Sequence, residues 1–162
     1  MNWRTVRCGA SSCLALMRLV LDFWTDGENV EEVIDQPSMS RVKEAIAALN
    51  GASRTMVSLM HNEQCYLHVA GPFNGGYLVN GTLDSRDFFS LKDISADSKE
   101  VRCFIGGQDG AYRAEQFVPR QSAERAAECF CKYQDLSPDL EWYSRNGRGP
   151  RLERKDVTSR EN

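Results

Sequence analysis

The stretch RTMVSLMHNEQCYLHVAG, residues 54–71, decides the fold class of this 162-residue chain. Its two β-patterned apolar runs, 54–60 and 65–71, flank the polar residues His61-Asn62-Glu63-Gln64. This pattern predicts two neighbouring strands joined by a turn at those four residues. Because a short polar connection joins antiparallel strands, the stretch predicts two strands of an antiparallel sheet.

Further strands are expected on both sides of this hairpin. Residues 18–23 alternate between apolar and polar, and residues 30–34 are expected to pair back onto them through the turn-forming residues 25–29. Downstream, three β-patterned runs follow at intervals typical of an antiparallel meander. They occupy residues 75–83, 87–93 and 100–107.

Two amphipathic helices accompany the strands. The first is predicted over 40–49, with Ser38 or Ser40 as N-cap and Asn50-Gly51 at the C-cap. Its apolar stripe is Val42, Ala45, Ile46 and Leu49. The second runs through 120–133 after Pro119, and one of its faces carries Ala123, Ala126, Ala127 and Phe130. The predicted fold is α+β: an antiparallel sheet of about six strands with two helices packed on one face.

The segments around the second helix are shorter. Before it, Asp109-Gly110 is expected to form a tight turn leading to a short edge strand. After it, Ser137-Pro138 ends the helix, and an extended segment at 140–143 places Trp142 in the core. The chain divides into an irregular N-terminal extension (1–16), one α+β domain (17–143) and a disordered basic tail (144–162).

Charge is unevenly distributed along the chain. The tail has six basic and three acidic residues, whereas the whole chain has a net charge of −3, so residues 1–143 have about −6. An acidic body disfavours nucleic acid as a direct ligand, because phosphate contacts need clustered Lys and Arg. It suits a basic protein partner.

Six cysteines without a C-x-x-C pair, and no apolar segment long enough for a secretion signal or membrane span, lead us to expect a cytoplasmic protein with mostly buried thiols. No membrane contact is expected.

The nine residues MHNEQCYLH, Met60 to His68, hold both histidines, and His61-Asn62-Glu63 matches the H-x-E step that begins the zinc deaminase signature. The downstream P-C-x-x-C is missing, and strand alternation places Cys65 and His68 on opposite faces. We therefore expect no metal, no cofactor and no catalytic residue. The alternatives are a small thiol- or metal-dependent enzyme using Cys65 or His61 and Glu63, and a nucleic-acid-binding module using the basic tail.

A family pattern is present from residue 75 onward. It consists of a glycine pair followed by Tyr, a strand ending in a second glycine pair, a V-P step into an alanine-rich helix with a late Phe, and a closing Trp. The residues are Gly75, Gly76, Tyr77, Gly106, Gly107, Pro119, Phe130 and Trp142. In this order and spacing, residues 17–143 resemble immunity protein family 1 of bacterial polymorphic toxin systems. Cys129 and Cys131, and the segments before Met17 and after Tyr143, are not part of the pattern.

The resemblance implies an antitoxin encoded beside a toxin and used in interbacterial competition. Such a protein neutralises its cognate toxin by stoichiometric tight binding that blocks the active site, and the toxin is commonly a nucleic-acid deaminase domain, which can contain zinc. The family residues serve turns and core, so they do not locate the toxin-binding surface. For that surface we predict an acidic and aromatic stretch, formed by Asp84, Asp87, Phe88, Phe89 and Asp93.

Overall fold

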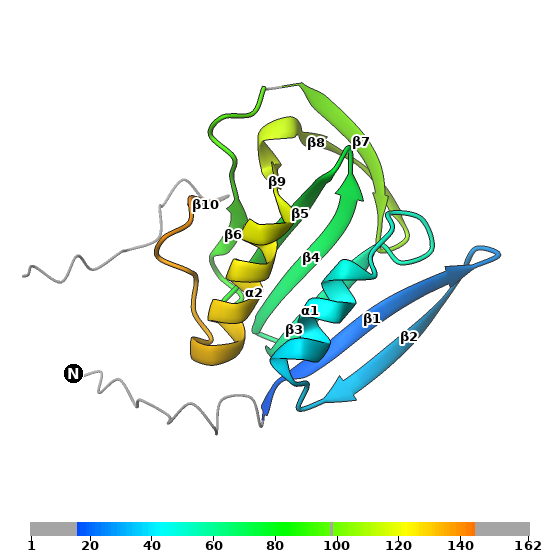
Figure 1. Ribbon diagram of the computed structural model, residues 1–162, viewed down its shortest axis with the longest axis vertical. Coiled ribbons are helices and arrows are strands. Elements are labelled where there is room, and N and C mark those ends of the chain that lie inside the picture. Colours follow the sequence, from blue (N-terminus) through cyan, green and yellow to red (C-terminus); the bar gives the residue numbers. More distant parts are fainter. Residues whose placement is uncertain (1–15, 98, 145–162) are drawn as a thin grey trace, which may run out of the picture.

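The computed structural model describes residues 16–97 and 99–144 of the chain. Figure 1 shows two helices lying across a large sheet. The helices are α1 (Met39–Ala47) and α2 (Arg120–Tyr133), with a short 3-10 helix η2 (Ala114–Gln116). The strands are β1 (Arg18–Thr25), β2 (Glu28–Asp35), β3 (Met56–Asn62), β4 (Cys65–Phe73), β5 (Gly76–Thr82), β6 (Phe88–Leu91), β7 (Glu100–Ile105), β8 (Gln108–Arg113), β9 (Phe117–Val118) and β10 (Trp142–Ser144).

Within the described residues the main sheet is antiparallel and has eight strands, in the order β10-β6-β5-β4-β3-β1-β2, with β9 paired to β5. The predicted α+β class with a large antiparallel sheet and two helices is therefore confirmed, although the sheet has more strands than the six expected. Helix α1 connects β2 to β3, and β3 then pairs with β1 rather than β2. This leaves β2 at one edge of the sheet.

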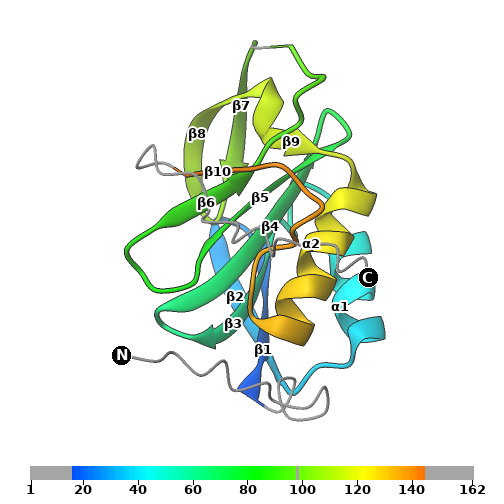
Figure 2. The ribbon, with the colours of Figure 1, turned by 90° about the vertical axis from the view of Figure 1, so that its left-hand side faces the viewer.

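Both helices cover the same face of the main sheet (Figure 2). The stripes predicted for the helices meet the inward residues of the central strands, and Ile46, Leu67, Val69 and Phe130 are almost fully buried there. Burial of this apolar surface is the main force that holds the helices on the sheet. Among the described residues, no helix is long and apolar enough to cross a membrane.

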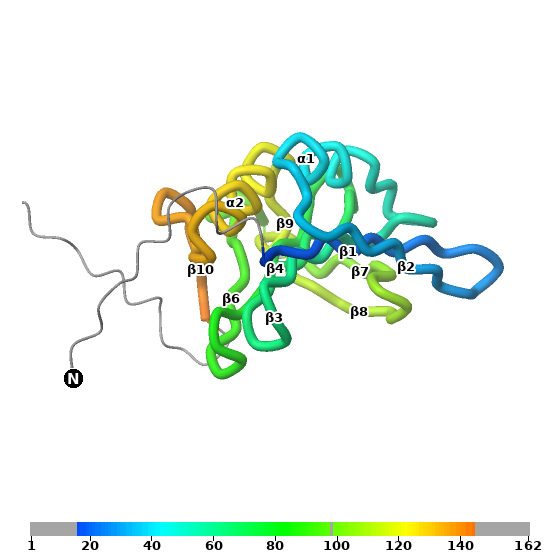
Figure 3. The backbone as a smooth tube through the Cα atoms, turned by 90° about the horizontal axis from the view of Figure 1, so that it is seen from below, coloured from blue at the N-terminus to red at the C-terminus, as the bar shows by residue number. Residues whose placement is uncertain are grey.

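The pair β7–β8 lies on the other side of the main sheet (Figure 3). It forms a separate two-stranded sheet and packs over a second, smaller apolar cluster that includes Ala70, Leu78, Cys103 and Phe117. The prediction that residues 100–107 extend the meander is wrong, because β10 takes the place beside β6. Among the described strands, β7 consequently pairs with β8 alone, and the face of this pair packs against the main sheet.

Two predicted turns are displaced. The β7–β8 turn is formed by Gly106 and Gly107, whose φ values are 56° and 84°, while Asp109 and Gly110 lie within β8. A type I′ turn needs positive φ at both central residues, which two glycines supply at no steric cost. In the central hairpin, His61 and Asn62 belong to β3, and the turn shortens to Glu63-Gln64.

The ends of two elements also differ from the prediction. Ser38, one of the two residues predicted as N-cap, caps α1, but the helix ends at the C-cap Ala48 and not at Asn50-Gly51. The Asn50 side chain instead accepts hydrogen bonds from the backbone N–H groups of residues 52, 53 and 54. These bonds stabilise a loop after the helix. Ser144, assigned to the tail, is the last residue of β10. The remainder of the predicted tail and residues 1–15 of the predicted extension lie outside the described residues.

Candidate functional site

The hairpin β1–β2 projects from the body of the molecule (Figure 1). Its acidic side chains outnumber its basic ones six to one. The acidic residues are Asp22, Asp26, Glu28, Glu31, Glu32 and Asp35. Large apolar side chains are exposed among them. Phe23 (43% exposed) and its partner Val30 (62%) lie on one face of the hairpin, and Val33 (52%) lies on the other. An exposed apolar surface surrounded by charge of one sign is typical of a protein-binding site.

The local sequence explains why this hairpin forms. Asp26 and Gly27 have φ values of 52° and 82°, as a two-residue type I′ turn requires. From this turn, β1 and β2 pair over eight consecutive positions, Thr25 with Glu28 through Arg18 with Asp35, without a register shift. The result is a long and regular two-stranded ribbon, whose outer strand β2 has only Ile34 partly buried.

Asp22 fixes this ribbon to the rest of the sheet. The pairing of β1 with β3 covers Arg18 to Leu21 and is interrupted at Asp22, whereas Trp24 N–H again donates to the Ser53 carbonyl (2.7 Å). The buried Asp22 carboxylate bridges the gap, where it accepts hydrogen bonds from the backbone N–H of Thr55 (2.8 Å) and Met56 (2.9 Å). It also accepts hydrogen bonds from the Thr55 hydroxyl and from Nε1 of Trp24 (2.8 Å). Asp22 is thus a structural carboxylate.

A second contact joins the ribbon to β7–β8. Trp24 packs edge-on against Phe104, with ring centroids 5.5 Å apart, and Gly106 N–H donates to Oγ1 of Thr55 (3.1 Å). Gly107 lets the Trp24 ring approach, because a Cβ built on Gly107 would lie 2.6 Å from Cη2 of Trp24. The turn residues Gly106 and Gly107 therefore contact the residues that hold the acidic hairpin in place, Thr55 and Trp24.

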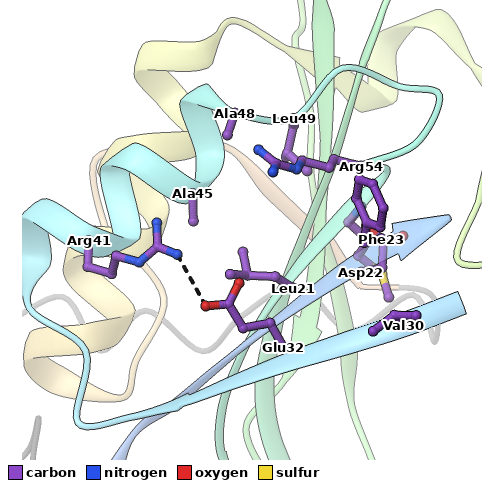
Figure 4. A pocket seen from close by; sticks show the side chains of 11 residues that line it. Leu21, Asp22, Phe23, Val30, Glu32, Arg41, Ala45, Ala48, Leu49 and Arg54 are labelled. Carbon is purple, nitrogen blue, oxygen red and sulfur yellow. Dashed lines mark hydrogen bonds and ion pairs between the residues drawn. The ribbon is translucent and has the colours of Figure 1, made fainter. Parts of the chain in front are cut away.

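A cavity of about 350 Å³ lies between α1 and the hairpin (Figure 4). Apolar side chains of β1 and α1, among them Leu21 and Ala45, line its inner part. Its rim is charged: Arg41 pairs with Glu32 at 3.6 Å, and the Arg54 guanidinium lies 5.8 Å from the centre of the Phe23 ring. Such a cavity fits an apolar side chain of a partner, with polar groups available at the entrance.

The predicted surface at residues 84–93 is divided by β6. Asp84 accepts hydrogen bonds from the backbone N–H of Asp87 and Arg86, and these lower its pKa. At the other end of β6, the Ser95 side chain and backbone donate to Asp93 and lower its pKa. These two carboxylates therefore hold their own loops in place.

The two phenylalanines of the predicted surface lie on opposite faces of the sheet. Phe88 is 37% exposed, whereas Phe89 is 8% exposed and faces the helix side. Alternation along β6 exposes one ring and buries the other. Of the predicted aromatic pair, only Phe88 offers exposed surface.

Cys65 and His68 are separated as strand alternation predicts. Cys65 faces the helix-side core, and burial raises the pKa of its thiol. His68 is on the opposite face, where Nδ1 lies 2.7 Å from Oγ of Ser58, and burial lowers the pKa of its imidazole to about 4. His61 lies at the register irregularity of β3. Within residues 16–97 and 99–144, no three His, Cys, Asp or Glu side chains gather as metal ligands would.

The four described cysteines are buried free thiols: Cys65, Cys103, Cys129 and Cys131. Burial raises the pKa of Cys131 to about 12. These thiols therefore stay protonated and pack as small apolar groups. Cys8 and Cys13 lie outside the described residues.

The remaining residues of the family pattern serve turns and packing. Gly75 has a φ of 80° in the β4–β5 turn, and a Cβ on Gly76 would lie 2.7 Å from Cβ of Phe117. Tyr77 is buried beside β9, and Pro119 is the N-cap of α2. Phe130 is part of the main core. Trp142 is partly buried and packs against this core, and its Nε1 donates a hydrogen bond to the Ser137 carbonyl (3.0 Å).

Sequence reasoning did not select the β1–β2 hairpin as a site. The signal was nevertheless present, since six carboxylates fall within residues 22–35, with Val30 and Val33 among them. Strand alternation places Val30 and Val33 on opposite faces of β2, and only the edge position of β2 shows that both stay exposed.

The fold and this surface define an α+β domain with a projecting acidic hairpin. A comparison of the chain with protein-family models finds no match, and neither does a comparison with curated proteins.

Proposed function

We propose that this chain is an immunity protein that binds a cognate bacterial toxin domain one to one and neutralises it. The proposed toxin is a nucleic-acid deaminase domain, and the chain blocks its active site. The proposal rests on the family resemblance of residues 17–143 and on the chemistry of the β1–β2 hairpin. It assigns no catalytic role to any residue of this chain.

The observation that carries the proposal is the concentration of negative charge on the projecting hairpin. The described residues include twenty acidic and twelve basic side chains, and six of the acidic ones lie in the hairpin. A toxin that acts on nucleic acid needs a basic groove for the phosphates. The carboxylates of the hairpin complement such a groove and compete with the nucleic acid for it.

The exposed apolar side chains supply what charge alone does not. Complementary charge mainly raises the association rate, whereas buried apolar contacts slow dissociation. Phe23 and Val30 provide that apolar area on the helix-side face of the hairpin, and Val33 adds to it on the opposite face. An inhibitor that protects its own cell benefits from a Kd of about 1 nM or below, which corresponds to about −12 kcal/mol.

Calorimetric titration tests this proposal. The full chain is titrated into the toxin domain encoded beside it, with the catalytic glutamate of that domain replaced. We expect a one-to-one complex with nanomolar or lower Kd, and inhibition of the active toxin at equimolar ratio. Absence of binding would contradict the proposal and favour the alternative of a small enzyme, for which hyper-reactive thiols or bound zinc would then be measured.

A further inference from the structure

The outer edge of β2 is an open end of the main sheet. In the part of the chain that the structure describes, β2 pairs with β1 on one side and with no strand on the other. Its eight residues are paired to β1 at every position, with no bulge. We infer that this edge receives an extended, basic segment of the toxin domain as an additional strand of the sheet. The inference rests on the proposed function and names the contact through which it operates.

The backbone groups at this edge follow from the pairing. Trp24 N–H donates to the Ser53 carbonyl (2.7 Å), on the side of β1 away from β2. Antiparallel pairing alternates, so the neighbours Phe23 and Thr25 direct their backbone groups toward β2. Their partners Val30 and Glu28 are engaged with β1, as are Glu32 and Ile34 farther along. The outward N–H and C=O groups therefore belong to the residues between them: Asn29, Glu31, Val33 and Asp35.

The side chains along the edge select the occupant. Edge strands that avoid pairing use prolines, bulges, inward-pointing charges or charged side chains, especially lysines, and like charges act only against a strand of the same sign. Strand β2 has no proline, lysine or bulge, and its charged side chains are all acidic: Glu28, Glu31, Glu32 and Asp35. Two copies of β2 would bring like charges together, which disfavours pairing between copies. A strand with Lys or Arg would instead find a complementary partner at each of these positions.

The cavity beside the hairpin adds a second determinant. Val30 and Glu32 lie on the helix side of β2 and line the cavity of about 350 Å³ (Figure 4). Side chains alternate along an added strand, so every second one would lie on this side, next to the cavity. Main-chain hydrogen bonds would then provide affinity, and the cavity would provide specificity, as in other cases of strand addition.

Hydrogen exchange measured by NMR tests this inference on the unaltered full chain. When the inactivated toxin domain binds, we expect exchange at the outward amides of Asn29, Glu31, Val33 and Asp35 to slow by about tenfold or more. The amides of Val30, Glu32 and Ile34, already bonded to β1, should change little. A complex in which the outward amides exchange as in the free protein would overturn the inference and leave the proposed function intact.

A matched pair of variants gives a second readout. Val33→Pro removes one outward N–H and leaves the pairing with β1 in place, whereas Val33→Thr keeps that N–H. We expect Val33→Pro to weaken toxin binding by about thirtyfold, and Val33→Thr by about threefold at most. Circular dichroism shows whether both variants fold. Equal affinities of two folded variants would contradict strand addition.

Peptides test whether the β2 edge binds a basic strand, independently of whether the partner is the proposed toxin. The probe is a capped peptide of about seven residues that alternates lysine and valine, and its control has glutamate in place of lysine. Only the lysine peptide should protect the outward amides. Protection by this peptide, without binding of the toxin domain, would keep the basic-strand edge and refute the proposed function. No protection by either peptide or toxin would refute both.

The basic tail of the chain itself is the competing occupant. Residues 145–162 have six basic and three acidic side chains. If the outward amides are already protected in the free full chain, and lose this protection when the chain ends at Ser144, the edge belongs to the tail and the inference is wrong. Pairing between two copies would instead appear as a dimer in analytical ultracentrifugation.

Discussion

The hairpins β1–β2 and β7–β8 are built alike and are placed differently. Each turns through two residues with positive φ, Asp26-Gly27 in one and Gly106-Gly107 in the other, and each pairs without a register shift. The first joins the main sheet by its edge, whereas the second packs on the sheet by its face.

The two hairpins also differ in charge. The β7–β8 hairpin is balanced, with Glu100 and Asp109 against Arg102 and Arg113, whereas β1–β2 has six acidic residues and one basic residue. A hairpin that buries one face against the sheet needs no charge of a particular sign. The two hairpins thus share the ribbon geometry that folding needs, while the charge of a single sign is confined to β1–β2, the hairpin proposed to bind a basic partner.

The largest expected effect is on the attachment of β1–β2. Asp22→Ala should lower the free energy of unfolding by about 3 kcal/mol, because it leaves the buried N–H groups of Thr55 and Met56 without an acceptor. Urea unfolding measures the loss. The control, Asp109→Ala, removes an exposed carboxylate from β7–β8 and should change stability by less than about 0.5 kcal/mol. Equal losses would show that the two hairpins do not differ in how their carboxylates are used.

We expect the loss of folding stability at low pH to come from His68 in the main sheet and not from the carboxylates of the β1–β2 hairpin. The folded-state pKa of His68 is lowered to about 4 from 6.5, so below pH 6.5 the unfolded chain binds a proton that the folded chain does not. Stability is therefore full above pH 6.5 and falls as the pH drops toward 4, by about 2 kcal/mol at pH 5.

His68→Gln tests the source of this loss. Unfolding measured at pH 7 and pH 5 should show little of the loss in the variant. The comparison variant, Glu28→Gln with Glu31→Gln, should keep it. The reverse result would assign the acid sensitivity to the β1–β2 hairpin and not to His68 in the sheet.

Charge reversal compares the hairpins as binding surfaces. Glu28→Lys with Glu31→Lys should slow association with the toxin domain by about tenfold at low salt, because the attraction to a basic groove becomes repulsion. Glu100→Lys with Asp109→Lys makes the same change in net charge on β7–β8, and should have a smaller effect. Stopped-flow association at two salt concentrations measures both. If the two double variants behave alike, only the net charge of the chain matters.

The smallest difference between the hairpins, about 1 kcal/mol, is expected between substitutions in their two turns. Gly27 and Gly107 have almost the same φ, 82° and 84°, but a Cβ on Gly27 meets nothing within 4 Å, whereas one on Gly107 meets Trp24. Gly27→Ala should therefore lose about 1 kcal/mol from backbone strain, and Gly107→Ala about 2 kcal/mol because the Trp24 ring must also move. Thermal unfolding of the two variants resolves this difference. Equal losses would mean that Trp24 does not depend on the β7–β8 turn.

Local patterns predicted most of the fold. The stripe of α1, the face of α2 and the separation of Cys65 from His68 all follow from helical and strand periods. These periods depend on neighbours within a few residues. The helix α2 even begins and ends where its pattern does, Arg120 and Tyr133.

Long-range partners were not predictable in the same way. Strand β10 is three residues long, yet by pairing with β6 it excludes β7 from the main sheet. The Asp22 carboxylate has its backbone donors 33 and 34 residues away. Neither contact follows from the spacing of apolar residues in the sequence. The exposed edge of β2, and with it the candidate site, could therefore be located only from the three-dimensional structure.

The three-way contact of Asp22, Thr55 and Gly106 has a thermodynamic consequence. It holds the base of a ribbon that otherwise projects from the body, so the ribbon loses most of its conformational entropy when the chain folds. A partner that docks on it then meets a preorganised surface, and little ordering remains to oppose association. Loosening this junction is expected to weaken binding even where no contacting side chain is changed.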